Sequence, residues 1–428
     1  MGRLLSWAHK GFFAVLDQGI FAGANFLVNV LLARWLEPVK YGAFAIAYSV
    51  FLLIGALHAA LITEPMMVFG AGKYSGKPRE YLGIVVRCHL YLVIPITAIL
   101  AALAVIFRYL YSHDVMAALL ALALSAPVVL LMWVLRHALY VSLRSDIAAL
   151  GSLVYFIIFT GLVAMTYWMR ALSATTALLC MGLSALPVCL VFIKYLQPKW
   201  GTAENPGFSS VPKDHWSYGR WALGTAALMW IPGNIYFLVL PVWLGLEGVA
   251  ALKAVMNFIL PMLNVISVLS LLLLPVFSRN IRMEPRRIPG IIKRCLIILF
   301  SASAAYFIIL VIFKVPLAHL LYRTKYDSFL YLIPVLCLLP FGASLTAVMG
   351  SVLRATESPD KVFLSYIGPG VFSLTFGVAL AAILALTGAV AGLIISSVLT
   401  GITMSILYRR FGKKPQLIGN VNLEEWSA

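Results

Sequence analysis

Long apolar stretches with almost no charge recur along the whole chain. A helix needs about 20 mostly apolar residues to cross a bilayer, and nine charge-free runs of roughly that size can be read from the sequence. They are residues 41–63, 88–107, 115–135, 147–169, 171–193, 221–246, 254–278, 295–313 and 328–353. Barrel strands would instead alternate in segments of about ten residues. The pattern therefore predicts transmembrane helices.

Two more stretches complete the set of predicted helices. The run 362–408 carries no charge and is long enough for two helices, with Thr387-Gly388 as the predicted hairpin between them. The segment 11–33 is apolar apart from Asp17 and a few amides. We therefore expect an all-α polytopic membrane protein, with 12 transmembrane helices in two six-helix lobes around a central cavity.

The connection between the sixth and seventh predicted helices is rich in Pro, Gly and Ser, which is typical of a linker. The expected divisions are an N-terminal lobe (1–196), a cytoplasmic linker (197–220), a C-terminal lobe (221–411) and a cytoplasmic tail (412–428). A short similarity supports two related halves, because Leu36-Glu37 and Leu246-Glu247 occupy comparable positions 210 residues apart. Halves with six helices each would run parallel in the membrane.

Composition and charge agree with this assignment. The chain is 62% apolar and 11% charged, whereas soluble domains average about 45–50% and about 25%. This excludes an ordinary soluble enzyme, and a nucleic-acid-binding protein would be rich in charge. With the N-terminus inside, 24 of the 32 basic residues fall in cytoplasmic segments. The positive-inside rule therefore predicts that both termini are cytoplasmic and that basic loops contact membrane lipids.

Two predicted helices carry a polar stripe along one face, where residues are four and seven positions apart. The stripes are Gln18, Asn25 and Asn29 in the first helix, and Lys253, Asn257 and Asn264 in the eighth. Such residues usually face a water-filled cavity, although amides also bond neighbouring helices together. Both interpretations stay open for the asparagines. For Lys253 we favour the cavity over a side chain that reaches for the membrane surface.

Other ionisable side chains lie in or near the predicted spans. The bases are Arg34, Arg87, Arg136 and Arg354, and the acids are Asp17 and Glu64. A cationic cavity would attract an anion, and phosphate groups are natural partners for Arg and Lys. Arg136 could instead extend toward the interface. The two acids would either carry H⁺ or Na⁺, or form structural ion pairs.

The sequence gives no sign of a cofactor. All five cysteines fall in predicted spans, which argues against a disulfide framework. The seven histidines lack metal-ligand spacing, and residues 71–78 lack the first glycine and final Ser/Thr of a phosphate loop. We therefore expect no metal, no nucleotide and no enzymatic activity, with H⁺ or Na⁺ as the only candidate coupling species.

Three segments resemble a known family. They are Asn-Phe-Leu at 25–27 with Leu-Ala-Arg-Trp-Leu-Glu-Pro at 32–38, Tyr-Gly-Ala-Phe-Ala at 41–45, and Val-Leu-Arg-Ala-Thr-Glu at 352–357 followed by Lys361. They are similar to segments of bacterial polysaccharide repeat-unit flippases, the Wzx-type members of the multidrug/oligosaccharidyl-lipid/polysaccharide (MOP) exporter superfamily. The motifs cover only the first two helices and the tenth, while the twelve-helix layout covers the whole chain.

The resemblance implies a transport function in the bacterial cytoplasmic membrane. Such proteins flip undecaprenyl-pyrophosphate-linked oligosaccharide from the inner to the outer leaflet by alternating access, with a cationic cavity between two lobes. The candidate substrate-binding residues are Lys253, Arg136, Arg87, Arg354, Arg34, Asn25, Asn29 and Asn257, and the candidate coupling residues are Asp17 and Glu64. Arg34 falls on a motif position that could equally be architectural. The expected partners are the lipid-linked oligosaccharide and the polysaccharide polymerase machinery, and no nucleic acid.

Two other functions stay open. A multidrug or small-solute cation antiporter could share this fold, but drug-exporting relatives rely on acids in their cavities, whereas bases outnumber acids in these spans. A membrane glycan polymerase would need catalytic residues in a sizeable loop, and the predicted outer loops are short and carry no acid/base constellation.

Overall fold

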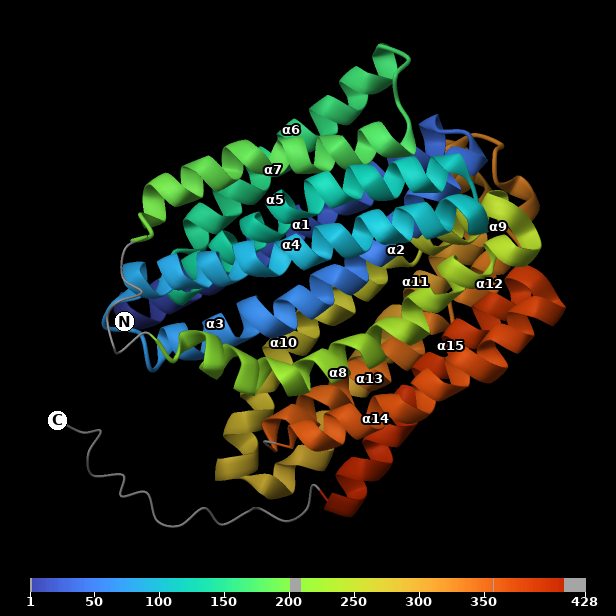
Figure 1. The fold of residues 1–428 in the computed structure, drawn as a ribbon. Coiled ribbons are helices and arrows are strands. Elements are labelled where there is room, and N and C mark those ends of the chain that lie inside the picture. Colours follow the sequence, from blue (N-terminus) through green and yellow to red (C-terminus); the bar gives the residue numbers. More distant parts are fainter. Residues whose placement is uncertain (1, 201–208, 357, 412–428) are drawn as a thin grey trace.

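The computed structural model describes residues 2–200, 209–356 and 358–411, and all regular structure in this part of the chain is helical (Figure 1). The predicted tail at 412–428 lies outside the described residues. The first half contains α1 (Gly2–Trp35), α2 (Pro38–His58), the π-helix η1 (Ala59–Thr63), α3 (Glu64–Ala71), α4 (Pro78–Leu110), α5 (His113–Val141), α6 (Ser145–Trp168) and α7 (Ala174–Leu196).

The second half has more interruptions. It contains α8 (Val211–Val239), α9 (Pro241–Asn257), α10 (Leu260–Met283), the short 3₁₀ helix η4 (Pro285–Arg287), α11 (Ile288–Tyr322), a second 3₁₀ helix η5 (Asp327–Phe329), α12 (Leu332–Leu336), α13 (Leu339–Ala355), α14 (Pro359–Phe372), the π-helix η6 (Ser373–Gly377) and α15 (Val378–Phe411). Several of these breaks coincide with prolines, which remove a helical hydrogen bond.

Twelve membrane crossings were expected, and the described helices agree with that number. Eleven helical stretches are long and apolar enough to span a membrane. The last, Asp360–Arg410, turns at Ala385, whose φ is 54°. A Cβ built on Gly388 would overlap the carbonyl of Leu380, whereas eight residues of straight helix span about 12 Å. This stretch therefore folds back as a hairpin, two residues before the expected Thr387-Gly388 turn.

The seventh crossing differs from the expected run 221–246. Helix α8 begins at Val211, with Pro212 in its first turn, where proline is compatible with a helix start. It ends at Val239, and the chain then turns at Gly245, whose φ is 61°, before α9 continues. A charge-free run marks only the apolar part of a helix, and α8 extends beyond it into residues that carry Lys213, Asp214 and Arg220.

The helices form two lobes, α1–α7 and α8–α15, which lie as two layers in Figure 1. Helix α2 packs against both α8 and α9 of the other lobe. We call the end of the bundle where α1 and α11 finish (Trp35 and Tyr322) the clasp end. The end where α7 finishes and α8 starts (Leu196 and Val211) is the linker end.

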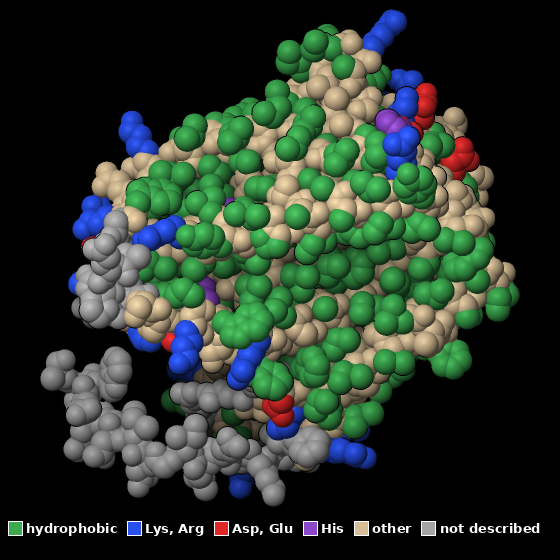
Figure 2. Space-filling model, viewed as in Figure 1, with side chains coloured by type: hydrophobic (Ala, Val, Ile, Leu, Met, Phe, Trp, Pro, Cys, Tyr) green, Lys and Arg blue, Asp and Glu red, His purple; other side chains and the backbone are tan. Residues whose placement is uncertain are grey.

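Apolar side chains cover the broad flank of the molecule seen in Figure 2, and most charged side chains gather toward its margins. Large apolar residues such as Tyr91, Ile94 and Ile383 are exposed on the surface of the molecule. A soluble monomer rarely exposes contiguous apolar surface of this extent. The chain therefore has the surface of a multi-pass membrane protein.

Candidate functional site

Two of the predicted site residues, Asp17 and Arg136, form a buried ion pair inside the first lobe. Arg136 of α5 donates from Nε (2.8 Å) to Asp17 Oδ2 in α1, and its Nη2 lies 2.6 Å from the same oxygen in an ion pair. The hydroxyls of Tyr140 and Ser152 also donate to this carboxylate, and the guanidinium stacks 4.6 Å from the Phe21 ring centre. The carboxylate is therefore well satisfied by donors from α5 and α6.

The amides of the first polar stripe bond mostly to their own helix. Asn25 Nδ2 donates to Phe21 O (2.9 Å), and Asn29 Nδ2 donates to Asn25 O (2.8 Å). Asn29 Oδ1 is buried without a hydrogen-bond partner among the described residues. Neither amide bonds to the second lobe in this part of the chain, so the stripe leaves only one acceptor for another molecule.

Lys253 lies buried between the two lobes. This residue of α9 is 8% exposed, and its Nζ sits 5.0 Å from the ring centre of Tyr48 in α2 and 5.5 Å from that of Phe237 in α8. A cation over aromatic faces is partly stabilised by the ring quadrupoles. Among the described residues, Lys253 has no acidic partner, so it is a cation that an anion could neutralise.

Asn257, one helical turn beyond Lys253, connects the lobes through two tyrosines. Its Nδ2 donates to the hydroxyl of Tyr41 in α2 (3.2 Å) and to that of Tyr322 in α11 (3.1 Å). The Tyr322 hydroxyl donates in turn to Ala254 O (3.2 Å). These residues are fully or almost fully buried. In this conformation Asn257 therefore joins the two lobes rather than facing open space.

Arg34 lies at the clasp end rather than beside Lys253. Its Nη1 donates to Leu320 O (2.7 Å), near the end of α11. Lys325, just after α11, donates from Nζ to Ala33 O (3.1 Å), Arg34 O (2.7 Å) and Leu36 O (2.6 Å) at the end of α1. Burial, together with the nearby Arg323, lowers the pKa of the Lys325 ammonium. Each lobe thus supplies a cation to the other lobe's helix C-terminus, where cations are favourable.

Glu64 and Arg354, two opposite charges from different lobes, interact electrostatically near the linker end. Glu64 begins α3 in the first lobe, and Arg354 lies in the last turn of α13 in the second. Arg354 is the charge that acts on the Glu64 carboxyl, yet no ion pair within 4.0 Å joins them, and both are exposed. The lobes are joined at the linker end as well, because Lys73 and Tyr74 of the first lobe bond the Asp214 carboxylate at the start of α8. Glu64 and Arg354 do not close on each other there.

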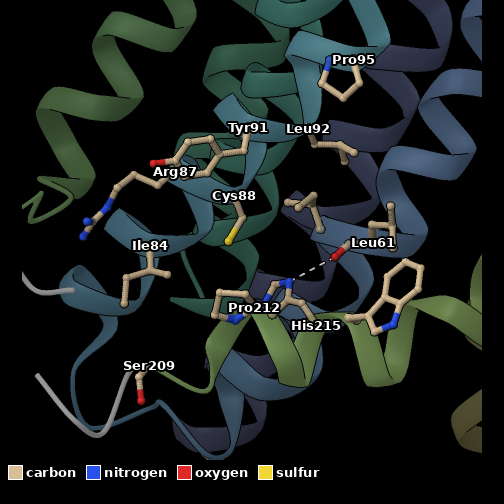
Figure 3. Close-up of a pocket in the computed structure, with 12 residues that line it drawn as sticks. Leu61, Ile84, Arg87, Cys88, Tyr91, Leu92, Pro95, Ser209, Pro212 and His215 are labelled. Carbon is tan, nitrogen blue, oxygen red and sulfur yellow. Dashed lines mark hydrogen bonds between the residues drawn. The ribbon is translucent and has the colours of Figure 1, made fainter. Parts of the chain in front are cut away.

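Arg87 lines a pocket between the lobes near the linker end (Figure 3). The pocket has a volume of about 590 Å³ and is walled by η1 and α4 on one side and by the start of α8 on the other. Its walls are mostly apolar, including Leu61, Leu92 and Trp216. Arg87 Nε and Nη2 are buried without a hydrogen-bond partner among the described residues. The guanidinium therefore has donors to spare for an anionic group.

A histidine that the sequence did not single out connects α8 to the first lobe. His215 Nδ1 donates to Leu61 O (3.1 Å), and the Tyr81 hydroxyl bonds to its Nε2 (2.8 Å). Pro65 has no N–H, so the Leu61 carbonyl four residues earlier lacks its helical donor. His215 supplies that donor from the other lobe. The proline is visible in the sequence, but the partner 150 residues away is not.

The structure thus distributes the predicted residues over several places. Asp17 pairs with Arg136, Lys253 and Asn257 lie between α9 and α2, and the remaining bases occupy the two ends. A mobile anion could meet Arg87 at the linker end and Lys253 deeper between the lobes. Asp17 is less available to another molecule, because its carboxylate already accepts three hydrogen bonds and pairs with Arg136.

Comparisons with known proteins identify the fold. No protein-family model and no curated protein matches this chain. An inward-facing conformation of a multidrug resistance MATE family transporter of the MOP superfamily is similar to it, with a TM-score of 0.77 and 16% identity over 93% of this chain and 97% of that one. An outward-facing conformation of a MATE family transporter gives a TM-score of 0.66 and 16% identity, with 95% of each chain covered.

A third solved structure is a MOP superfamily transporter from Pyrococcus furiosus, described as having a reversed polarity of its binding pocket that suggests a different function. Its TM-score is 0.68, with 16% identity and 95% of each chain covered. These identities establish a shared fold. The chain shares the all-helical fold of these transporters, and the all-α polytopic fold class expected from the sequence is confirmed.

Proposed function

We propose that this chain is a membrane transporter that moves a lipid-linked oligosaccharide from the inner to the outer leaflet of a bacterial cytoplasmic membrane. The observation that carries the proposal is the charge between the lobes. Lys253 is buried there without an acidic partner among the described residues, and Arg87 Nε and Nη2 have no hydrogen-bond partner in the same part of the chain. A pyrophosphate group would supply the missing negative charge and accept those donors.

Alternating access fits the contacts at the two ends. Hydrogen bonds join α1, α2, α9 and α11 at the clasp end. At the linker end the lobes meet through the start of α8, where Lys73 pairs with Asp214 and His215 bonds Leu61 O, and Glu64 and Arg354 do not pair with each other. The higher TM-score with the inward-facing relative than with the outward-facing one supports the same state. Basic residues concentrate in the segments of the linker end, so the positive-inside rule assigns that end to the cytoplasm.

The second candidate is a multidrug or small-solute cation antiporter, which is favoured by the MATE multidrug transporters among the structural relatives. A cationic drug would, however, meet Lys253 without an opposing acid. Asp17, the buried acid of the first lobe, is committed to Arg136. Like charge disfavours binding by several kcal/mol in a low-dielectric site, so we rank the anionic lipid-linked substrate first.

The test uses a strain from which the gene is deleted. This strain is complemented with the wild-type gene, with the Lys253→Gln variant or with the Arg108→Gln variant. Arg108 is an exposed base in the last turn of α4 and serves as the matched control. We expect Lys253→Gln to lose most surface polysaccharide and to accumulate lipid-linked oligosaccharide by mass spectrometry, with an unchanged protein level. Lys253→Arg should restore part of the polymer.

Drug susceptibility distinguishes the two candidates in the same strains. The flippase proposal predicts that deletion leaves the minimum inhibitory concentration of ethidium unchanged while polymer is lost. Increased ethidium sensitivity with intact surface polysaccharide would instead favour the antiporter. Accumulated oligosaccharide that already faces the outer leaflet would favour a block in polymerisation.

A further inference from the structure

A pair of buried histidines in the first lobe has no role in the charge arrangement described above. His58 is the last residue of α2, and His89 lies in α4. Their rings meet edge to face with His58 Nε2 at 2.9 Å from His89 Nδ1. Each side chain is 1% exposed. Two imidazoles this close must share one proton, because one nitrogen donates and the other accepts.

The backbone of α5 favours one direction for this hydrogen bond. Pro127 acts on the His89 ring through its backbone, and because proline has no N–H, its carbonyl can only accept. Since His89 Nδ1 faces His58, Nε2 is the nitrogen that can donate toward this carbonyl. In that tautomer a neutral His89 keeps its lone pair on Nδ1, so His58 donates from Nε2 and keeps its own lone pair on Nδ1.

That remaining nitrogen is vacant. His58 Nδ1 is buried and has no hydrogen-bond partner among the described residues. A buried polar atom without a partner costs free energy and is uncommon in native structures. Here the vacant atom is a base, and histidine is the side chain that ordinarily gains a proton between pH 5 and 8. The pair therefore holds one empty position for a proton.

We propose that the His58–His89 pair is the proton-coupling site of this transporter, with His58 Nδ1 as the atom that binds the proton. The use of the proton rests on the proposed transport function, whereas its binding does not. Proton uptake converts neutral His58 to an imidazolium that donates from both nitrogens. No acid balances this charge among the groups that act electrostatically on His58, which are His89 and His137.

The surrounding elements present mainly neutral or basic groups. Helix α4 contributes His89 beside Cys88, and α5 contributes His137, on which Arg136 and the Asp17 carboxylate paired with it both act. Helix α7 presents Cys189, which donates to Val128 O. Helix α8 presents His215, whose two ring nitrogens are hydrogen-bonded to Leu61 O and to the Tyr81 hydroxyl. Helix α9 presents Lys253, which lies over the Tyr48 ring, and Tyr48 is about 15 Å from His58 along α2. On its own span, the nearest acid is Glu64, beyond η1. A proton on His58 is therefore an uncompensated charge that favours a different arrangement.

The structure provides an element that can rearrange. His58 is followed directly by the π-helix η1 (Ala59–Thr63), and π-helical turns often mark functional sites. Leu61 in this turn bonds His215 of the other lobe. Leu61 and Cys88 line the pocket that contains Arg87 (Figure 3), and Leu61 follows His58 by three residues while Cys88 precedes His89 by one. A shift of η1 on protonation would therefore reach both α8 and the pocket.

The test measures hydrogen exchange of the purified full chain by mass spectrometry at pH 7.5 and 5.5, corrected for the intrinsic effect of pH. In the wild type we expect exchange of the peptides covering 56–66 and 211–219 to increase at least threefold at pH 5.5. His58→Gln can still donate to His89 but offers no basic nitrogen, so its exchange should not change with pH. His113→Gln, at an exposed position at the start of α5, should respond like the wild type.

Hydrogen exchange reports on proton binding by the histidine pair and does not depend on which substrate is transported. His215→Gln should keep the response in 56–66 and lose it in 211–219, because it removes only the connection to α8. An equal response in His58→Gln and the wild type would overturn the proton site. Hydrogen exchange of the wild type that is the same at pH 7.5 and 5.5 would also overturn the proton site, whether or not the variants fold. Polysaccharide export in the complementation assay tests the transported substrate independently of either result.

Discussion

Lys325 donates to the carbonyl oxygen of Arg34 at 2.7 Å, while Arg34 reaches across to the C-terminal turn of the helix that precedes Lys325. The two cations belong to different lobes, and each caps the helix end of the other's lobe. Helix C-termini carry partial negative charge and unpaired carbonyls. In this reciprocal arrangement both cations donate to backbone carbonyls rather than to carboxylates.

The first prediction concerns this clasp. Lys325→Met removes three hydrogen bonds from the end of α1 and should weaken the closed clasp end by about 1 kcal/mol, the usual scale for a cation at a helix C-terminus. Thermal unfolding in detergent should show a lower midpoint than for the wild type. Arg108→Met, at an exposed helix end within one lobe, should leave the midpoint unchanged. Equal midpoints for both variants would contradict the clasp.

A second prediction concerns the close approach of the lobes at Gly42. A Cβ built on this residue of α2 would overlap the carbonyl of Leu246 in α9, whereas one built on Gly23 of α1 meets nothing within 4 Å. Gly42→Ala should therefore separate the lobes at the clasp end, at a cost of about 1–3 kcal/mol for overpacking. Gly23→Ala should be neutral or slightly stabilising in a helix.

Distances between spin labels on the two lobes at the clasp end would measure this effect. Labels should move apart in Gly42→Ala relative to the wild type and stay in place in Gly23→Ala. Unchanged distances in Gly42→Ala would show that the backbones need not meet for the lobes to close.

The third prediction concerns the ion pair in the first lobe. Asp17→Asn leaves the Arg136 guanidinium buried without its counter-charge, and breaking such a pair costs about 3–5 kcal/mol. Arg136→Gln should cost a similar amount. The double variant should be more stable than the sum of the two losses predicts, which a double-mutant cycle on unfolding in detergent would reveal. Strictly additive losses would indicate that the pair contributes no coupling energy.

A fourth prediction separates stability from function at Lys253. Its ammonium is buried against two aromatic rings without an acid, and a buried charge costs several kcal/mol before partial compensation. Lys253→Met keeps the volume and should raise stability by about 1 kcal/mol or more in detergent. The same variant should export no polysaccharide. A stabilised variant with normal export would exclude Lys253 from the substrate path.

The sequence alone determined the number of crossings, because each one requires about 20 apolar residues and charge is too costly to interrupt such runs. It also indicated the two halves, and it identified Asp17, Arg136 and Lys253 as unusual because ionisable residues are rare inside spans. Helix ends were less well determined. Helix α8 begins ten residues before its charge-free run, since a helix continues wherever its backbone bonds are satisfied, whether the side chains are apolar or not.

Only the tertiary structure decided which side chains meet. Asp17 and Arg136 are 119 residues apart, and Arg34 and Leu320 are 286 apart. No local pattern encodes such pairs, since they depend on how the fold brings α1 to α5 and to α11. The same holds for His58 and His89, which appear as isolated histidines in apolar runs until α2 and α4 place their rings in contact. Spacing along one helix fixes a face, but only the neighbouring helix determines whether that face meets a carboxylate, a carbonyl or another imidazole.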